Sequence, residues 1–421
     1  MILTPSNKSK SPSVSSPKSA APTKSKTAAT SVRNPKNKTK NNKHVLDTDD
    51  ITTQTPTFLG SGTYGCVFNP PLKCSDPKKS KLTLNPRNVG KVYFRVQDFE
   101  DERDIMKKVS KEVDPEGSFT VKFSGDCHIS KPAPEVLATA SEGCKRLQGN
   151  EYQIMYPDGG SDLKQFYNKY REKPRKFFDL FKAMKPIFAG LSVLDKKKLI
   201  HNDIKPANML YNPKLKRITL IDYGMMSAYK DIFRHYSGTN DAFYMYYPPE
   251  YRIINNIVQT NECTSVSSVM RFYTKSFEPV DPVEFFAAFG IDLKRDASNL
   301  IRVYNYSLKR QRGFDVNNKP EANTILPHTT PRKTMRTPKS VSMLFDQALD
   351  KIDVYSLGIS IAYIIRSMGL VDPLVVAKLS IMERMQLSII KQLIYHMIRP
   401  NVFERWDVKT VLAYVTTHCF P

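Results

Sequence analysis

A polar loop between two apolar stretches is the feature of this sequence that most constrains its fold. Residues Leu199–Leu210 read LIHNDIKPANML, with one His, two Asn, one Asp and one Lys within eight consecutive residues. Apolar flanks of this kind are typical of buried segments, where polar side chains must find partners. The pattern therefore predicts a loop that the core holds rigid at a functional cleft, whereas an ordinary solvated loop is the alternative.

A glycine-rich segment, GSGTYGCV at Gly60–Val67, lies well before this loop. Three glycines at this spacing let a turn pass close to phosphate groups and offer them backbone N–H groups. A dinucleotide-binding fold would need a helix directly after the glycines. The sequence instead continues with FNPP, which favours a strand–turn–strand geometry.

Lys91 follows in the strand-like segment VGKVYF, between apolar residues. A partly buried lysine needs an anionic partner, and the sequence offers either a nucleotide phosphate or an acid of the helix predicted at Asp98–Val109. In that helix Glu102 lies near the apolar face, and Glu100 is the rival. An exposed lysine on an edge strand is the alternative interpretation.

The polar loop has a possible partner 14 residues beyond Asn208, where Asp222 ends an apolar run and precedes Tyr223. Amide and carboxylate oxygens are suitable Mg²⁺ ligands for a metal-bound triphosphate, so Asn208 and Asp222 are candidate metal ligands. A hydroxyl that attacks the γ-phosphate needs a carboxylate to orient it, and Asp203 fits this role. Lys205 fits the role of a cation that balances developing charge.

Taken together, these motifs resemble those of serine/threonine protein kinases. GSGTYGCV is similar to the glycine-rich loop, His201–Asn208 to the catalytic loop, and Asp222–Gly224 to the metal-binding motif. YYPPE, ending at Glu250, resembles the end of the activation segment, and DVYSLG, beginning at Asp353, resembles the helix that anchors the catalytic loop. Arg405 resembles the partner of Glu250. The motifs also resemble those of divergent kinases of large DNA viruses.

The resemblance implies ATP and Mg²⁺ as cofactors and the transfer of the γ-phosphate of ATP to serine/threonine hydroxyls of protein substrates. It implies catalytic roles for Asp203 and Lys205, and metal binding by Asn208 and Asp222. The ATP-binding residues that it implies are Leu59, Gly60, Ser61, Gly62, Thr63, Tyr64, Gly65, Cys66, Val67, Lys91 and Glu102.

Two positions depart from the family pattern. Asn202 stands where the family usually has an arginine that receives a phosphate from the activation segment. This departure implies activity that does not depend on phosphorylation there. Tyr223 replaces the usual phenylalanine, which exchanges one aromatic ring for another.

The coarse pattern predicts an α+β, bilobal protein-kinase-like fold over residues 54–421, with a small β-rich N-lobe at 54–156 and a larger helical C-lobe at 157–421. Strands are predicted around the glycine-rich turn and at 88–96, 118–125 and 151–156. Long helices are predicted at 176–200, 350–365 and 379–398. An insertion at about 251–345 is interpreted as irregular, and its basic, Pro-rich second half as a flexible excursion.

Residues 1–50 are predicted to form a disordered basic tail, because the segment has too few apolar side chains to offset its ordering entropy. The formal net charge of the chain is +23, and residues 1–46 contribute ten positive charges and no acid. Nucleic acid or another polyanion is therefore a candidate partner, bound without sequence preference through phosphate contacts. A purely solvating tail is the alternative, and the oligomeric state is left open.

The six cysteines include no C-x-x-C pair, and no signal peptide opens the sequence. These observations predict free thiols in a reducing, intracellular compartment, either a host cytoplasm or a virion if the chain is viral. Zinc at Cys127-His128 and Cys144 is a weaker alternative. The longest apolar run carries Asp353 and Arg366, which predicts a buried helix and no membrane span.

Two other functions compete with an active protein kinase. One is a pseudokinase-type scaffold or binding module that uses the basic tail and the insertion. The other is a small-molecule kinase of related fold, but the PPE and DVYSLG segments favour the protein-kinase branch.

Overall fold

The computed structural model describes residues 55–62, 64–79, 85, 87–232, 243–253, 265–311 and 345–420. In the helix that ends at residue 311, side chains are described as far as residue 305. Thr52–Pro421 forms one compact unit. The predicted basic tail at 1–50 and the predicted flexible excursion lie outside the described residues. The boundaries of the two predicted lobes stay a prediction.

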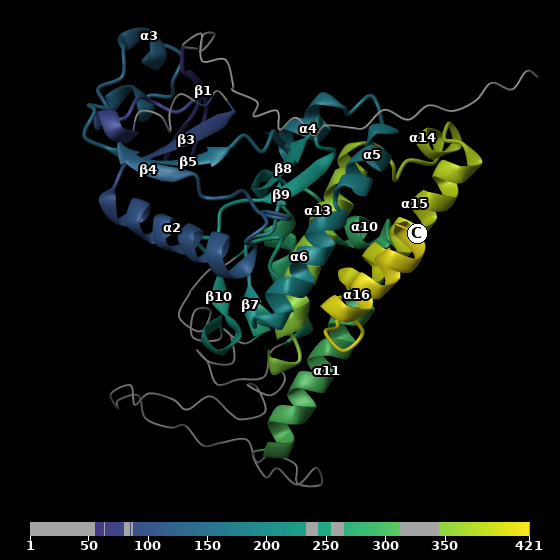
Figure 1. Ribbon diagram of the computed structural model, residues 1–421. Coiled ribbons are helices and arrows are strands. Elements are labelled where there is room, and N and C mark those ends of the chain that lie inside the picture. Colours follow the sequence, from purple (N-terminus) through teal and green to yellow (C-terminus); the bar gives the residue numbers. More distant parts are fainter. Residues whose placement is uncertain are drawn as a thin grey trace, which may run out of the picture. The chain divides into compact units, whose positions relative to one another are not determined.

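An antiparallel sheet of five strands forms the N-terminal part of this unit, in the order β1-β2-β3-β5-β4 (Figure 1). Its strands are β1 (Thr57–Gly62), β2 (Gly65–Asn69), β3 (Asn88–Tyr93), β4 (Gly125–His128) and β5 (Tyr152–Pro157). Helix α2 (Val96–Lys108) packs on this sheet through Phe99, whose ring stacks on Tyr152 at 4.4 Å. The strand–turn–strand geometry predicted for the glycine-rich segment is confirmed.

The strand predicted at 118–125 forms only at its last residue, where β4 begins. The reason is that a carboxylate accepts hydrogen bonds from backbone N–H groups of this segment, which then cannot pair with a strand. Asp114 accepts hydrogen bonds from the N–H groups of Ser118, Phe119 and Thr120 at 2.8, 2.8 and 2.9 Å. Thr120 pairs with Leu220 in an isolated bridge and does not join the five-stranded sheet.

Helices dominate the chain after β5, so the predicted α+β class, with a β-rich part before a helical part, is confirmed. The helices are α3 (Pro134–Leu137), which precedes β5, then α4 (Leu163–Lys169), α5 (Lys176–Ala183), α6 (Lys185–Lys196), α9 (Val266–Phe277), α10 (Pro282–Ala287), α11 (Leu293–Gln311), α13 (Ile352–Ser367), α14 (Pro373–Ala377), α15 (Ile381–Met397) and α16 (Val408–Tyr414). Short strands β6 (Ser161–Asp162), β7 (Leu199–Ile200), β8 (Met209–Asn212), β9 (Arg217–Leu220) and β10 (Ser227–Ala228) frame the polar loop.

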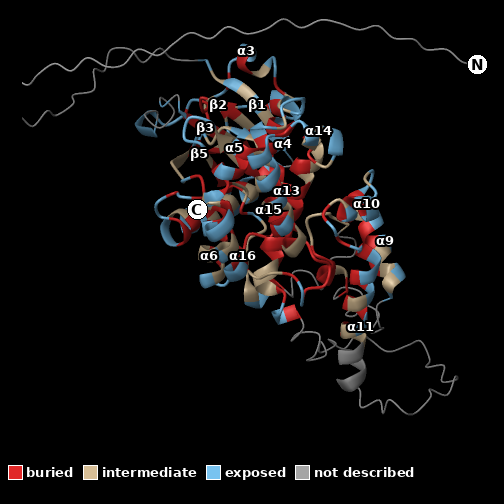
Figure 2. Cartoon of the chain, turned by 90° about the vertical axis from the view of Figure 1, so that its right-hand side faces the viewer, coloured by how far each residue is buried: buried red, intermediate tan, exposed pale blue. Residues whose placement is uncertain are grey.

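The central helix of this part is α13, whose residues are almost all buried (Figure 2). The single helix predicted at 176–200 is instead divided into α5 and α6 at Met184. Pro186, in the first turn of α6, has no N–H to continue the ladder of α5. None of the helices within the described ranges carries an apolar stretch long enough to cross a bilayer.

The interpretation of residues 251–345 as irregular is wrong for the part that the structure describes. Helices α9, α10 and α11 occupy most of 266–311. Aromatic rings of α9 and α10 pack together, with Tyr273 and Phe286 at 5.3 Å and Phe277 and Phe285 at 5.0 Å. These rings belong to the same hydrophobic cluster as the buried residues of α13, so this part of the insertion extends the core of the helical region.

The prediction of free thiols is wrong for four of the six cysteines. Cys66 is bonded to Cys144 and Cys74 to Cys127, with Cα–Cα distances of 6.0 and 5.8 Å. These distances are typical of disulfides. The four sulfurs are therefore not zinc ligands, and the argument for a reducing compartment loses its basis. Cys419 is a buried free thiol, and Cys263 lies outside the described residues.

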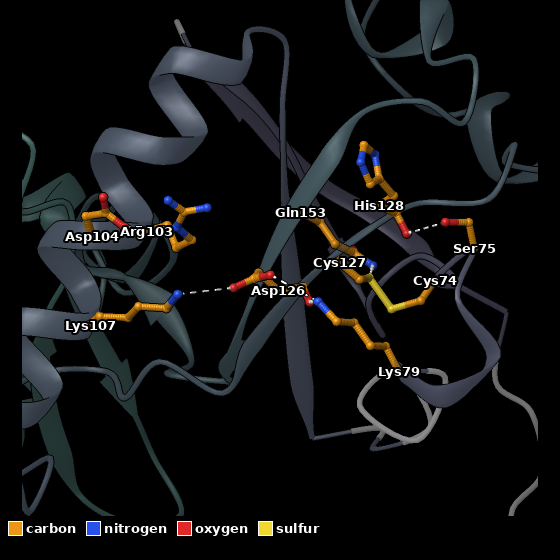
Figure 3. A network of polar contacts seen from close by, with 10 residues as sticks. All are labelled: Cys74, Ser75, Lys79, Arg103, Asp104, Lys107, Asp126, Cys127, His128 and Gln153. Carbon is orange, nitrogen blue, oxygen red and sulfur yellow. Dashed lines mark hydrogen bonds and ion pairs between the residues drawn. A yellow bond between two sulfur atoms is a disulfide. The ribbon is translucent and has the colours of Figure 1, made fainter.

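The Cys74–Cys127 disulfide is part of a polar network along the edge strand β4 (Figure 3). The Asp126 carboxylate, next to Cys127, forms ion pairs with Lys79 at 3.3 Å and with Lys107 of α2 at 3.7 Å. The segment that carries Cys74 and Lys79 is thus attached to β4 by a disulfide, an ion pair and backbone hydrogen bonding, with the Ser75 N–H donating to the His128 carbonyl oxygen at 2.9 Å.

Candidate active site

The polar loop is positioned by the buried helix α13. The Asp353 carboxylate accepts hydrogen bonds from the backbone N–H groups of His201 at 2.7 Å and of Asn202 at 2.9 Å. Asn202 has a left-handed backbone with φ 65°, a conformation that costs energy for a residue with a side chain and needs such support. The helix therefore fixes the turn that directs Asp203.

His201 has a structural place in this loop. It is fully buried, its Nδ1 accepts a hydrogen bond from the Asp203 N–H at 3.3 Å, and its ring lies 4.6 Å from that of Tyr223. Burial lowers the pKa of His201, and nearby carboxylates only partly oppose this effect. The imidazole is therefore neutral and supports the loop rather than exchanging protons.

Asp203 lies at the centre of a cluster of hydrogen-bond donors. Its Oδ2 accepts from Lys205 Nζ at 2.9 Å and from Asn208 Nδ2 at 2.8 Å. Its Oδ1 accepts from the Tyr244 hydroxyl at 3.1 Å. Burial, and then the Asp203 charge, raise the pKa of Tyr244, which keeps this hydroxyl protonated as a donor. The carboxylate is thus held in one orientation from two sides.

Asp222 lies next to this cluster. The Ile221 N–H donates to the Asn208 carbonyl oxygen at 3.0 Å, so the backbone brings the two predicted metal ligands together. Asp222 is half-buried with φ 64°, and within the described chain its carboxylate has no hydrogen-bond partner. The Asp222 carboxylate thus accepts no hydrogen bond from the described chain, and the Asn208 side-chain nitrogen is bound to Asp203. The Asp222 carboxylate oxygens and the Asn208 amide oxygen are hard oxygen ligands of the kind that Mg²⁺ prefers.

Lys91 on β3 forms an ion pair with α2. Its Nζ lies 2.5 Å from Glu102 Oε2, and the Tyr156 hydroxyl donates to Glu102 Oε1 at 3.0 Å. Of the two acids that the sequence left open, the structure brings Glu102 to the lysine, whereas Glu100 is exposed. Burial raises the pKa of Tyr156, as does the Glu102 charge to a smaller extent, so this hydroxyl remains a donor.

The glycine-rich turn joins β1 to β2, with Gly62 paired to Gly65. A side chain at Gly60 or Gly62 would meet no atom within 4 Å, so open space adjoins these two glycines. A Cβ at Gly65 would lie 1.8 Å from the Val92 carbonyl oxygen. Gly60 and Gly62 thus leave room for phosphates, whereas Gly65 is required by the packing of β2 on β3.

The other predicted nucleotide contacts divide between two faces of this hairpin. Val67 pairs with Lys91 in the sheet, so their side chains lie on the same face. The Cys66 side chain is buried on the other face in its disulfide, which leaves only its backbone for a nucleotide. Leu59, Ser61 and Tyr64 are exposed, and Thr63 lies outside the described residues.

A buried ion pair follows the segment that carries Tyr244. Glu250 Oε1 lies 3.0 Å from an Nη of Arg405, and both side chains are fully buried. Arg405 Nε also donates to the Arg399 carbonyl oxygen at 2.9 Å, and its guanidinium lies 4.8 Å from the centre of the Tyr355 ring. The pair attaches the end of this segment to the helical core.

Residues 145–265 match the protein kinase domain family. This part of the chain is thus similar to the protein kinase domain family. Calcium-dependent protein kinase 3 of Plasmodium yoelii yoelii is 28% identical over 179 residues, which are 41% of this chain and 27% of that protein. Mitogen-activated protein kinase kinase 7 of Arabidopsis thaliana is 26% identical over 200 residues, 46% of this chain and 62% of that one. This chain thus spans less than two thirds of either kinase.

A solved kinase-domain structure is also similar, with 14% identity and a TM-score of 0.39 over 85% of this chain and 93% of that one. The match to the kinase family includes Asp203, Lys205, Asn208 and Asp222, but it begins after Lys91 and Glu102. The assignment of these two residues therefore rests on their ion pair. The resemblance to kinases of large DNA viruses stays a prediction.

Two residues of this kinase-like site were missed by sequence reasoning. Tyr244 contacts Asp203, and Tyr156 contacts Glu102. Tyr244 stands among several tyrosines before Glu250, and nothing in that run distinguishes it from its neighbours. Tyr156 ends a predicted strand, where an aromatic residue is expected for packing alone.

Proposed function

We propose that this chain is an ATP-dependent serine/threonine protein kinase that uses Mg²⁺. The observation that carries the proposal is the Asp203 carboxylate held by Lys205 and Asn208, with Asp222 beside it. The ion pair of Lys91 and Glu102 supports it, because a lysine fixed in this way is poised for nucleotide phosphates. Lys205, two residues after Asp203, supports the serine/threonine type by resemblance.

In the proposed reaction, Asp203 orients a substrate hydroxyl toward the γ-phosphorus of ATP. A bond forms between the hydroxyl oxygen and phosphorus, the bond to the ADP oxygen breaks, and Asp203 accepts the hydroxyl proton. Lys205 balances negative charge on the transferred group. Asn208 and Asp222 are the residues that would hold Mg²⁺, which when bound neutralises phosphate charge.

Incubation with γ-labelled ATP, Mg²⁺ and a protein mixture tests this function. The proposal expects label on phosphoserine and phosphothreonine after acid hydrolysis of the products. Label confined to phosphotyrosine would overturn the serine/threonine type, and label confined to small metabolites would support the small-molecule kinase. ATP binding without any transfer would support the pseudokinase-type scaffold.

Replacing Asp222 by alanine is expected to abolish the dependence of ATP affinity on magnesium and to remove turnover. The change deletes a carboxylate that has no hydrogen-bond partner within the described chain, so it breaks no contact of the fold. The measurement is a titration of ATP affinity at several magnesium concentrations, with a thermal melt as the control for folding. A magnesium dependence equal to that of the wild type would contradict the assignment.

Complete dephosphorylation is expected to leave the activity largely unchanged. Asn202 is buried and its side-chain oxygen accepts a hydrogen bond from the Tyr251 hydroxyl at 2.9 Å, so an uncharged contact occupies this position. The test is treatment with a broad phosphatase, removal of the phosphatase, and a kinase assay. A large loss that is restored by phosphorylation within residues 225–247 would refute this independence.

A further inference from the structure

A cavity of about 630 Å³ lies in the helical region, away from the Asp203 cluster. Its walls come from the connection between α4 and α5 and from the segment that joins α13 to α15 through α14. Figure 1 shows α5 and α14 next to each other, and Arg175 donates to the Lys378 carbonyl oxygen at 3.1 Å. The cavity is therefore bounded by elements that contact one another directly.

Six basic side chains line this cavity, and Glu172 is the one acid among its lining residues. The basic residues are Arg171, Lys173, Arg175, Lys176, Arg366 and Lys378. Arg175 is paired with Glu383 at 3.5 Å and Lys176 with Asp179 at 3.4 Å. Within the described chain, the other four have no ion-pair partner. Such a concave site of one sign concentrates anionic ligands.

The floor of the cavity is apolar. Met368 and Leu379 are buried there, and Val375 is half-buried. An apolar floor under a cationic rim fits an acidic peptide that also carries an apolar side chain. A nucleic acid duplex would instead be matched by an extended basic surface without such a floor.

Tyrosines pack beside Asp203 and on the helix face that carries Arg366. Tyr244, on the Asp203 carboxylate, has its ring 5.2 Å from that of Tyr246. Burial, followed by the effects of Tyr167 and Tyr363, raises the pKa of Tyr246. Tyr363 and Arg366 are three residues apart on α13 and so share one helix face.

We propose that this cavity binds an acidic segment of the protein substrate, so that the chain prefers substrates with a cluster of Asp and Glu residues at a distance from the phosphorylated hydroxyl. The preference rests on the proposed kinase function, whereas the binding site itself does not. Arg171, Lys173, Arg366 and Lys378 supply the charge, and the apolar floor accepts a leucine-like side chain of the same segment.

The test of binding uses the full chain and a fluorescent peptide of Asp, Glu and Leu that has no Ser, Thr or Tyr. Lys173→Glu combined with Lys378→Glu is expected to weaken binding by at least about tenfold at physiological salt, since a charge contact near a protein surface is worth roughly a factor of ten. Both lysines are exposed, so the fold should persist, and a thermal melt checks this. The matched control is Lys214→Glu with Lys409→Glu, which changes the net charge equally at exposed positions that do not line the cavity.

Equal binding by both double variants would overturn the proposal, because any effect would then come from overall charge. A different result would overturn it in favour of a nucleic acid site: the acidic peptide does not bind, and duplex DNA binds more weakly only to the cavity variant, Lys173→Glu with Lys378→Glu.

A second experiment uses a serine peptide with and without a distant acidic cluster. The cavity variant should raise KM about tenfold for the acidic peptide only, with kcat unchanged. Cavity-dependent binding without phosphorylation of either peptide would refute the kinase function and leave the site intact.

Discussion

Asp203→Asn is expected to reduce phosphoryl transfer by about 10²- to 10⁴-fold, the range that a positioned proton acceptor contributes. ATP affinity should remain close to that of the wild type, because Asp203 contacts Lys205, Asn208 and Tyr244 and is not part of the Lys91 ion pair. Turnover and nucleotide affinity are measured on the same preparation.

A matched control for this variant is Asp101→Asn. Asp101 is exposed on α2 and accepts a hydrogen bond only from Gln97 of the same helix among the described residues, so this change should leave both quantities unaltered. Wild-type turnover in Asp203→Asn would remove this residue from the catalytic role. A parallel loss of ATP affinity would assign it to nucleotide binding instead.

Arg405→Ala is expected to lower the free energy of unfolding by roughly 3–5 kcal/mol, the usual cost of leaving one charge of a buried pair alone. The substitution would strand the fully buried Glu250 carboxylate and would also remove a hydrogen bond to the Arg399 carbonyl. The measurement is denaturant unfolding with ATP absent, so that ligand binding does not affect the result.

The double variant Glu250→Gln with Arg405→Met provides the control for this prediction. It removes both charges, so it should recover much of the stability lost in Arg405→Ala. If the free energy of unfolding of Arg405→Ala lies within about 1 kcal/mol of the wild-type value, the ion pair does not attach this segment to the helical core.

The sequence predicted those parts of the site that depend on short-range patterns. Glu102 could be preferred over Glu100 because helical periodicity places it near the face of Met106, which is buried on α2. The catalytic-loop cluster could be predicted because Asp203, Lys205 and Asn208 lie within one loop. The ion pair at Lys91 needed only one strand and the helix that follows it.

Contacts between distant segments could not be predicted in this way. The two disulfides join cysteines 78 and 53 residues apart, and only the folded sheet brings them together. Tyr244 and Asp203 are 41 residues apart in the sequence. Nothing in the sequence distinguishes Tyr244 from the tyrosines next to it. The helices of 266–311 were missed because the basic, Pro-rich composition of the following segment dominated the interpretation of the whole insertion.

Transfer of the γ-phosphate of ATP to protein is the central step of the proposed function. The most direct measurement compares the wild type with Asp203→Asn on one protein mixture, with γ-labelled ATP and Mg²⁺, and identifies the labelled amino acids. We expect phosphoserine and phosphothreonine with the wild type, and a loss of both labels with the variant. Equal labelling by the two proteins, or none by a folded wild type that binds ATP, would contradict the proposed function.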